Sequence, residues 1–457
     1  MMGLQPRTEP LFYYFRLEDQ IPEHHLLRRI DRCVDFSFVR ERLRGAYSQM
    51  GRPSIDPEIL LRLLLVGYLY GITSERRLVE EVRMHLAYRW FTHLGFEQEI
   101  PDHSTFSKNR HGRFRESGIF LEVFEEVVPR CLEAGLVEGK RMTVDGTAVR
   151  ANASPQSRVL RQELGEVAKL SKTVREYLAE VEQENPVTDP GDREPTPSSA
   201  AARFVSATDP EACWAGKGGP AAPSYYDHYL IDNAHGIILG VEATPARFRQ
   251  EMLAARRMLE QVKGRWGICP ESLGADKAYG SGEFLAWLLE RNIQPHIPVI
   301  DRRHQTPRYF TQDQFQYDPE ENAYRCPQGQ MVRYRGLGVL TQSYLYRTSE
   351  SQCRACAMKR KCTRGANRRI SVSWYEPARQ AARELAKTAA YQQSRRERNK
   401  VEALFSELKQ RVGLRQVRLR GLWNVAEQFY LAATAQNLKR LARWLTQREP
   451  APTLCTA

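Results

Sequence analysis

Apolar residues recur at helical spacing through the first 125 residues, and capping residues mark where the predicted helices begin and end. Asp56 stands before a proline, which predicts a helix that starts there and runs to Gly71. Ser74 is the expected cap of a second helix over 75–91. This pattern predicts a helical N-terminal domain over residues 1–125.

A third predicted helix in this region is rich in basic residues. Asp102 or Ser104 is expected to cap it, and Lys108 and Arg110 lie on it. Short helices joined by tight turns, with a basic last helix, are typical of a helix-turn-helix-like DNA-binding domain. A helical dimerisation domain fits the same pattern nearly as well. We therefore expect this domain to bind DNA, through Lys108 and Arg110, or to form a dimer.

The pattern changes from helices to strands after residue 138. Short strand-like segments alternate with two helical stretches, at 248–263 and 282–291. Residues 233–236 join two strands as a hairpin, whereas later strands are separated by helices, so a mixed sheet is predicted. The predicted strands are 141–153, 225–232, 236–244, 272–280 and 293–300. This order predicts an α/β domain over residues 138–450.

An insertion interrupts this domain between its first two strands, over residues 155–224. The stretch 159–184 has a helical pattern, and a segment rich in Pro, Ser and acidic residues follows it. We expect a helical portion and then a linker.

One long predicted helix, from Ser394 to Gly413, carries a charged face beside an apolar stripe. At 100° per residue, one carboxylate, Glu402, and three cations fall within roughly 60° of one another. The cations are Arg395, Arg398 and Lys409. A carboxylate among cations suits metal-dependent chemistry on a polyanion. On this segment alone, an ordinary amphipathic helix with a solvated charged face is the favoured interpretation.

The charge balance points to a polyanionic partner. The 457 residues include 68 Lys and Arg against 55 Asp and Glu, which gives a net charge of +13. From Arg395 to Arg420 there are nine Lys and Arg against three acids, so this block is where we expect a phosphate backbone. Because no apolar run is long enough to cross a bilayer and no signal segment precedes the first helix, we expect a cytoplasmic protein without a membrane partner.

Four of the nine cysteines cluster in one short region, which favours reduced thiols and a metal over a disulfide framework. A CxxC pair, another cysteine six residues later and a preceding Cys-Pro supply four thiolates for a tetrahedral, structural Zn²⁺. Unliganded reduced thiols are the alternative. The four are Cys326, Cys353, Cys356 and Cys362. We therefore predict a zinc-knuckle insertion over residues 318–372.

Two aspartates follow short apolar stretches of predicted strands, the first before a glycine that leaves room for a ligand and the second before a turn. Asp145 follows Met-Thr-Val and precedes a glycine, and Asp276 follows Leu-Gly-Ala. Each alone is a weak signal, because Asp is common in such turns for conformational reasons. Together with Glu402 they give an ordered set: an Asp on the first strand, an Asp on a later strand and a Glu on a helix beyond.

The segments TVDGTAVRANAS, GADKAYG and RRERNKVEALFSELK together resemble the DDE transposases of bacterial insertion sequences. The helix most resembles that of the 1182 group and its Y-R-E-K signature sub-group, in which Tyr, Arg, Glu and Lys follow at fixed spacing. Arg398, Glu402 and Lys409 match this spacing, whereas Arg395 occupies the tyrosine position. The chain therefore departs from the family pattern at Arg395, where an arginine able to bind phosphate replaces the tyrosine.

The resemblance implies an RNase H-like catalytic core with two Mg²⁺ or Mn²⁺ ions per active site. Asp145 would bridge both ions, and Asp276 and Glu402 would each complete one site. Arg398 and Lys409 would contact phosphates near the scissile bond. The implied substrates are double-stranded DNA, namely the terminal inverted repeats of the element and the target, bound in the bacterial nucleoid by a homodimer that brings two ends together.

Several alternatives stay open at this point. One alternative is that Glu402 merely pairs with Arg398, and Glu407 is a second carboxylate on the helix. The same core suits a metal-dependent DNA endonuclease without strand transfer. A catalytically silent DNA-binding protein of transposase origin is a further alternative, which the presence of all three carboxylates disfavours.

Overall fold

The computed structural model describes residues 14–48, 50, 54–114, 117–160, 204–216, 220–246, 248–300, 309–339 and 341–448. The chain forms two compact units. The first comprises Met1–Val137, Ser406–Arg415 and Glu427–Ala457, and the second comprises Glu138–Phe405 and Gln416–Ala426. The strand-rich second unit thus begins at Glu138, and two C-terminal segments group with the helical unit.

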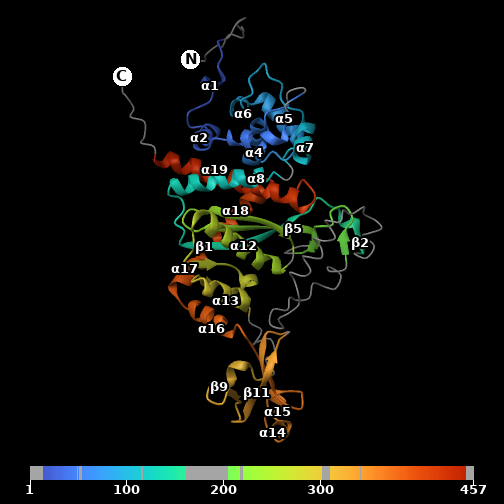
Figure 1. Cartoon of the computed structure of the whole chain (residues 1–457), viewed down its shortest axis with the longest axis vertical. Helices are drawn as coiled ribbons and strands as arrows, with labels where there is room; N and C mark the ends of the chain where they lie inside the picture. Colours follow the sequence, from blue (N-terminus) through green and yellow to red (C-terminus); the bar gives the residue numbers. More distant parts are fainter. Residues whose placement is uncertain are drawn as a thin grey trace, which may run out of the picture. The chain divides into compact units, whose positions relative to one another are not determined.

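The first unit is helical in the part of it that the structure describes, and it is built around one apolar helix (Figure 1). That helix, α4, begins with the Asp56 side chain accepting the Glu58 amide and ends at Gly71, whose φ of 70° favours glycine. Both predicted ends are confirmed. The helices of this unit are α1 (Leu17–Gln20), α2 (Leu26–Cys33), α3 (Phe38–Leu43), α4 (Pro57–Tyr70), α5 (Glu75–Met84), α6 (Leu86–Phe91), α7 (His103–His111) and α8 (Ile119–Glu133).

The single helix predicted over 75–91 is wrong, because the structure has two helices there. His85 separates α5 from α6 with an extended backbone, φ −107° and ψ 112°. The His85 amide still donates to the Glu81 carbonyl, which completes the last turn of α5, and α6 begins at the next residue.

The C-terminal helix α19 (Leu422–Arg448) explains why the last part of the chain belongs to the helical unit. From Glu427 onwards it runs beside α8, as the teal and red ribbons of Figure 1 show. Trp444 donates from Nε1 to the carbonyl of Ala134 at 2.9 Å, and the rings of Phe124 and Tyr430 lie 6.5 Å apart. Apolar residues of α19 are buried along most of its length, so this contact contributes much of the core of the unit.

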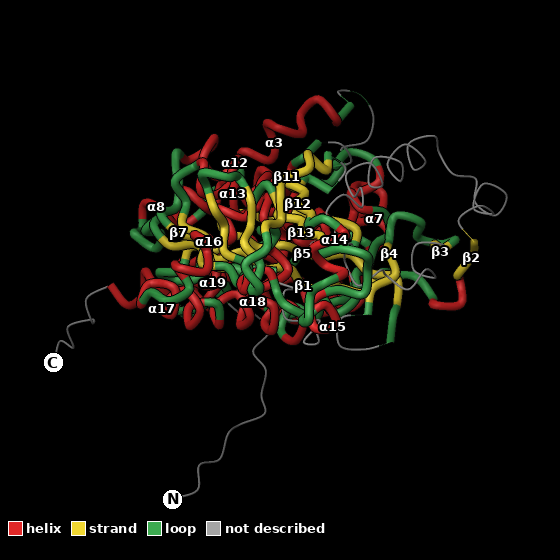
Figure 2. The backbone as a smooth tube through the Cα atoms, turned by 90° about the horizontal axis from the view of Figure 1, so that it is seen from below, coloured by secondary structure: helices red, strands yellow, loops and turns green. Residues whose placement is uncertain are grey.

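A six-stranded mixed sheet forms the centre of the second unit, with strand order β4-β5-β1-β7-β8 and β6 paired to β5 (Figure 2). Strand β1 is antiparallel to β5 and parallel to β7, which in turn is parallel to β8. The strands are β1 (Arg141–Arg150), β4 (Cys213–Ala215), β5 (Ala222–Asp232), β6 (Ile237–Pro245), β7 (Ser272–Gly274) and β8 (Gln294–His296). The hairpin between β5 and β6 and the mixed α/β class are confirmed. Each predicted strand overlaps an observed one, but the strands predicted over 272–280 and 293–300 are shorter than expected, and a 3₁₀ helix occupies Lys277–Tyr279.

Helices cover both faces of this sheet. On one face, Met258 of α12 (Phe248–Trp266) fills the space above Gly240, where an added Cβ would lie 3.0 Å from the methionine side chain. On the other face, Ser394 of α17 (Ala389–Glu397) lies near Gly274. Its Oγ shares a 2.6 Å hydrogen bond with His296 Nδ1. The helices α13 (Gly282–Glu290) and α16 (Glu376–Leu385) pack against each other beside β8.

A second, smaller sheet lies in the predicted zinc-knuckle insertion. It is antiparallel, has five strands in the order β13-β12-β11-β10-β9, and carries two short helices. Phe315, Val332, Tyr346, Ile370 and Val372 form its own small core. The elements are β9 (Gln316–Asp318), β10 (Ala323–Arg325), β11 (Met331–Gly338), β12 (Ser343–Arg347), β13 (Arg369–Ser373), α14 (Glu350–Arg354) and α15 (Lys359–Cys362). We call residues 310–373 the small-sheet insertion.

The insertion between the first strands is only partly described. The helix predicted from residue 159 is wrong at its start, because Val159 lies in β2 (Arg158–Leu160), which pairs with β3 (Phe204–Ser206). The rest of the predicted helix and most of the linker fall on 161–203, outside the described residues.

Candidate active site

The register of two parallel strands places the two predicted aspartates side by side. Thr143 of β1 pairs with Gly274 of β7, and Asp145 and Asp276 each lie two residues further along. Adjacent strands are about 4.8 Å apart, so Asp145, in the middle of β1, and Asp276, two residues past the end of β7, lie on neighbouring strands. Asp145 is buried and Asp276 is half-buried.

Backbone amides hold both carboxylates. The Gly146 amide donates to Asp145 Oδ1 at 2.8 Å, and the Ala278 amide donates to Asp276 Oδ1 at 2.8 Å. The second bond caps a short 3₁₀ helix over Lys277–Tyr279. Each bond engages one carboxylate oxygen and leaves the other oxygen free of these two amides.

Tyr279 adds a buried phenol to this cluster. Burial raises its pKa well above the usual value, and the charges of Glu251, Asp145 and Asp276 raise it further. Its hydroxyl has no hydrogen-bond partner among the residues that the structure describes. Tyr279 is therefore a neutral, fully buried phenol in the turn that follows Asp276.

Glu251 of α12, which is 3% exposed, was missed in the sequence analysis. Its carboxylate lies on the sheet face opposite to α17, since an added Cβ on Gly146 would lie 3.6 Å from its Oε1. The sequence does carry one sign of it. Glu251 shares a helix face with Ala255 and Met258, at i+4 and i+7, and an acidic residue is unexpected on such an apolar face.

Glu402 lies on α18 (Asn399–Gln410), one turn before the residue that docks this helix on the sheet. That residue, Phe405, stacks on Tyr229 of β5 with ring centroids 4.8 Å apart. Tyr229 is the cross-strand partner of Asp145, so both side chains project from the same face of the sheet. The structure thus brings α18 over the face that carries Asp145, with the Glu402 side chain exposed.

The continuous helix predicted over 394–413 is wrong, because the structure divides it at Arg398. Helix α17 ends at Glu397 and α18 begins at Asn399. The Val401 amide bonds to the Arg398 carbonyl at 3.1 Å, a tighter i to i−3 turn than that of an α-helix. Arg395 therefore lies on a different helix from Glu402, and a single helical wheel does not describe their relative positions.

The predicted cations of this region differ in their surroundings. Arg395 is exposed, whereas Arg398 and Lys409 are half-buried. Arg398 Nε is buried without a hydrogen-bond partner among the described residues. A buried guanidinium nitrogen of this kind is costly unless an anion binds to it.

The two carboxylates of α18 also differ. Glu407 bonds to Arg440 at 3.0 Å and lies 3.9 Å from Lys439, both on α19. Within the described chain Glu402 takes part in no ion pair, and its expected alternative pairing with Arg398 is not formed. Glu407 is thus engaged in the helical unit, and Glu402 is the carboxylate that remains available.

On α7, Lys108 and Arg110 have different environments. Lys108 is exposed, but the side chain of Arg110 is only 6% exposed and its guanidinium bonds to Glu75 at 2.6 Å. This ion pair joins α7 to α5 and lies largely inside the unit. Lys108 lies on the surface of the unit.

The four predicted zinc ligands converge in the small-sheet insertion. Cys326, Cys353, Cys356 and Cys362 line one pocket with a volume of about 20 Å³. Thr348 Oγ1 lies 3.0 Å from Cys353 Sγ, and burial raises the pKa of Cys362. A pocket of this size holds about one water-sized sphere, as a single ion requires.

Within the described ranges, no group of three or more His, Cys, Asp or Glu side chains has a geometry that holds a metal ion. The two aspartates and the four thiols are therefore candidate ligands by chemistry and proximity. No described helix is long and apolar enough to cross a membrane.

Two parts of the chain match known families. Residues 15–112 match the family described as a transposase domain (DUF772), and residues 325–442 match the family described as a transposase DDE domain. No curated protein and no solved structure matches the chain. The second match includes Glu402 and the four clustered cysteines, whereas Asp145 and Asp276 lie outside both. Both matches support a DDE-type transposase and indicate a function in transposition.

Proposed function

We propose that this protein cuts DNA at the ends of an insertion sequence and joins the freed ends to target DNA, using Asp145, Asp276 and Glu402. The observation that carries the proposal is the parallel register of β1 and β7, which puts Asp145 beside Asp276. The strand order, with β1 between an antiparallel hairpin and two parallel strands, supports an RNase H-like core. The helix carrying Glu402 covers the face from which Asp145 projects.

The donor set fits a hard divalent cation such as Mg²⁺ or Mn²⁺, because carboxylate oxygens are its preferred protein ligands. Asp145, Asp276 and Glu402 are the residues that would hold the two ions, with Asp145 shared between them. When bound, the two ions activate an attacking oxygen and stabilise the leaving oxygen of the phosphodiester. Glu402 joins the aspartates on α18, whose position relative to β5 is held by Phe405.

The proposed reaction has two steps, a hydrolysis and then a transesterification that leaves the number of phosphodiester bonds unchanged. Water first attacks the phosphorus at the element end, which breaks one P–O bond and leaves a 3′-hydroxyl. That hydroxyl then attacks a phosphodiester of the target, so one bond forms as one breaks. Arg398, Arg395 and Lys409 hold phosphates near the site, and the unpartnered Nε of Arg398 supports this role.

A structural Zn²⁺ on Cys326, Cys353, Cys356 and Cys362 organises the small-sheet insertion. The shared pocket and the tetrahedral chemistry of four thiolates support this site. Four thiolates leave no open position, so the ion takes no part in catalysis.

The helical unit binds element DNA through exposed groups such as Lys108 on α7. Two element ends must be brought together, so the active form is a homodimer on DNA. The bound DNA is the terminal inverted repeats of the element and a target duplex in the nucleoid.

The test is incubation of purified protein, with Mg²⁺ or Mn²⁺, with a duplex that carries the inverted repeats flanking its gene. Cleavage at the repeat end followed by joining to a plasmid target is the expected result. Cleavage without joining would identify an endonuclease, and binding without cleavage would identify a silent DNA-binding protein.

A further inference from the structure

Three arginines face one another across three neighbouring strands of the small sheet. Arg333 of β11 pairs with Arg347 of β12, and Arg347 pairs with Arg369 of β13. Directly paired residues project from the same face of a sheet, so the three side chains form one row. The arginine row is exposed: the Arg333 and Arg347 side chains are 64% and 42% exposed, and Arg369 is also exposed.

The row is poorly neutralised by the protein itself. Like charges at directly opposed positions destabilise a sheet. Glu321 lies 3.7 Å from Arg333 and Glu350 lies 3.8 Å from Arg347, and both acids are more than half exposed. Arg369 takes part in no ion pair in the described part of the chain. Exposed pairs of this kind contribute little, so the row keeps most of its positive charge.

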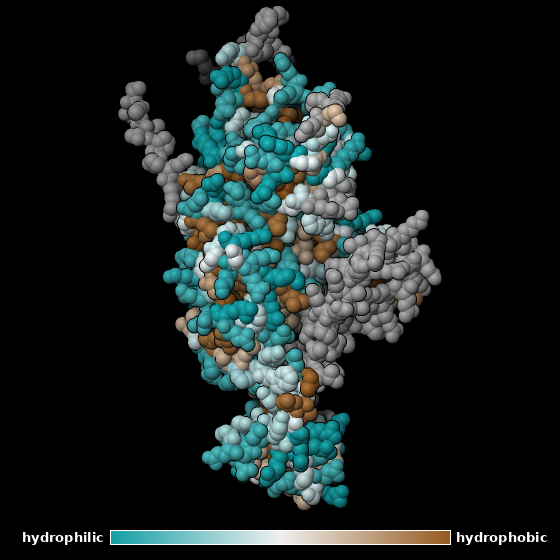
Figure 3. Space-filling model, in the orientation of Figure 1, coloured by the Kyte–Doolittle hydropathy of each residue, from teal (hydrophilic) through white to brown (hydrophobic). Residues whose placement is uncertain are grey.

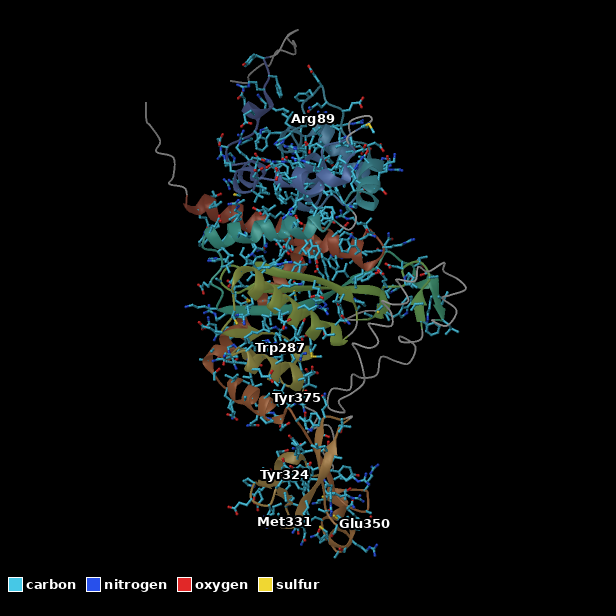
Figure 4. All side chains as sticks on the ribbon, in the orientation of Figure 1. Arg89, Trp287, Tyr324, Met331, Glu350 and Tyr375 are labelled. Carbon is cyan, nitrogen blue, oxygen red and sulfur yellow. The ribbon has the colours of Figure 1, made fainter. Side chains whose placement is uncertain are left out.

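The opposite face of the small sheet carries the aromatic side chains and the core. Each arginine of the row is adjacent in sequence to a residue of this other face, and consecutive strand residues point to opposite faces. The cross-strand pairs of this other face are Tyr346 with Ile370 and Tyr334, and Tyr324 with Val332 and Tyr317. Figure 4 labels Tyr324 and Met331 on this sheet and Glu350 at the start of α14. The surface of the insertion in view in Figure 3 is mostly hydrophilic. The arginine face thus offers charge without an aromatic platform on which unpaired bases stack.

We infer that the arginine row of the small-sheet insertion binds the phosphate backbone of duplex DNA, which extends the DNA contacts of the proposed function and rests on it. Neighbouring strands are about 4.8 Å apart, so the row spans roughly 10 Å. Each strand of a duplex carries one phosphate per about 3.4 Å of axis, so the row lies along roughly three phosphates. Guanidinium groups bind such oxygens in a bidentate manner. The contact positions DNA independently of its sequence.

The test is a full-length variant with Arg333→Gln, Arg347→Gln and Arg369→Gln, measured for duplex binding over a range of salt. Loss of three phosphate contacts is expected to weaken binding roughly tenfold or more at moderate salt and to lower the log–log salt slope by about 2 to 3. Because the row is self-repulsive, the melting temperature should stay the same or rise. Zinc content should not change.

The matched control is Arg354→Gln, Arg360→Gln and Lys361→Gln, which removes three exposed cations from α14 and α15 in the same insertion. Equal loss of binding in both triple variants would overturn the inference, since it would reflect net charge alone. A loss confined to single-stranded DNA of the same length would also overturn it. If the triple variant is unstable, Arg369→Gln alone, which breaks no ion pair, serves in its place. A wild-type protein that binds no duplex would reject the proposed function instead.

Discussion

The ring of Phe405 stacks on that of Tyr229 with centroids 4.8 Å apart, and this contact links helix α18 to the central sheet. Tyr229 pairs with Asp145 in the register of β1 and β5. Glu402 lies three residues before Phe405, so the same contact sets where its carboxylate lies relative to Asp145. A side chain without any ligand role thus positions two of the proposed metal ligands.

Replacing the docking ring should reduce both stability and activity. Phe405 is 7% exposed, so Phe405→Ala should lower the free energy of unfolding by about 3 kcal/mol. The remaining folded protein should cleave DNA more slowly, because α18 is no longer held over Asp145. Phe405→Leu keeps most of the volume and should cost less than about 1.5 kcal/mol with activity retained. Unfolding in urea and cleavage by the folded fraction give the two values; undiminished cleavage by folded Phe405→Ala would reject this link.

The two carboxylates of α18 should respond oppositely to removal of charge. Glu402→Gln should lower cleavage by at least about a hundredfold and leave the melting temperature and DNA binding nearly unchanged, because the side chain is exposed and takes part in no ion pair within the described chain. Glu407→Gln removes the bond to Arg440 and should cost about 1 to 2 kcal/mol of stability with cleavage retained. Loss of cleavage in Glu407→Gln alone would show that the catalytic glutamate is misassigned.

The central sheet could be predicted from the sequence because its strands are apolar and bounded by turn residues. What periodicity could not supply is the pairing: nothing in residues 141–153 or 272–280 states that β1 and β7 are parallel neighbours. Only the resemblance to a known family placed Asp145 with Asp276. Glu251 was missed for a related reason, since a single acid on an apolar helix face gives no sign of its partners.

The small sheet was missed because its strands are short and rich in Arg, Ser and Gly, and the apolar cluster that its described residues form is small. The breaks at His85 and Arg398 were missed for a different reason. Helical periodicity continues through both positions, and one local change of backbone bonding interrupts each helix.

Substitution of Arg110 should affect stability, and substitution of Lys108 should affect DNA binding. Arg110→Ala breaks a largely buried pair with Glu75 and should cost about 2 to 4 kcal/mol of stability. Lys108→Ala should leave stability within about 0.5 kcal/mol and lower the salt slope of duplex binding by about 1. Binding isotherms at several salt concentrations together with thermal melting measure both. A stable Arg110→Ala variant with weakened binding would instead make Arg110 a DNA contact.

One zinc per chain is expected in protein purified without chelator, as measured by atomic absorption. Cys356→Ser should lose the ion, whereas Cys269→Ser, at an exposed cysteine outside the cluster, should keep it. A cysteine thiol must lose its proton to bind zinc, and burial raises the pKa of Cys362. Zinc affinity should therefore increase as pH rises. Full zinc content in Cys356→Ser would indicate that the cluster is a set of free thiols.

Asp209 should give the stability of the second unit a pH dependence below neutrality. Burial raises the pKa of its carboxyl from 3.8 to about 6, although Tyr225 donates to Oδ1 at 2.6 Å and the Gly421 amide donates at 3.2 Å. The folded chain therefore binds more protons than the unfolded chain between about pH 4 and 6. Stability is fully present below about pH 4 and is lost as pH rises through about 6, by up to about 3 kcal/mol.

Asp209→Asn keeps the acceptor oxygen but does not titrate, so this contribution should disappear from the difference between melting curves at pH 4 and pH 7. Glu320→Gln, at an exposed acid, is the matched control and should leave the pH profile unchanged. An unchanged profile in Asp209→Asn would mean that the carboxyl is ionised in the folded protein throughout this range. In that case a cation would have to compensate its charge, because Oδ2 has no hydrogen-bond partner among the described residues.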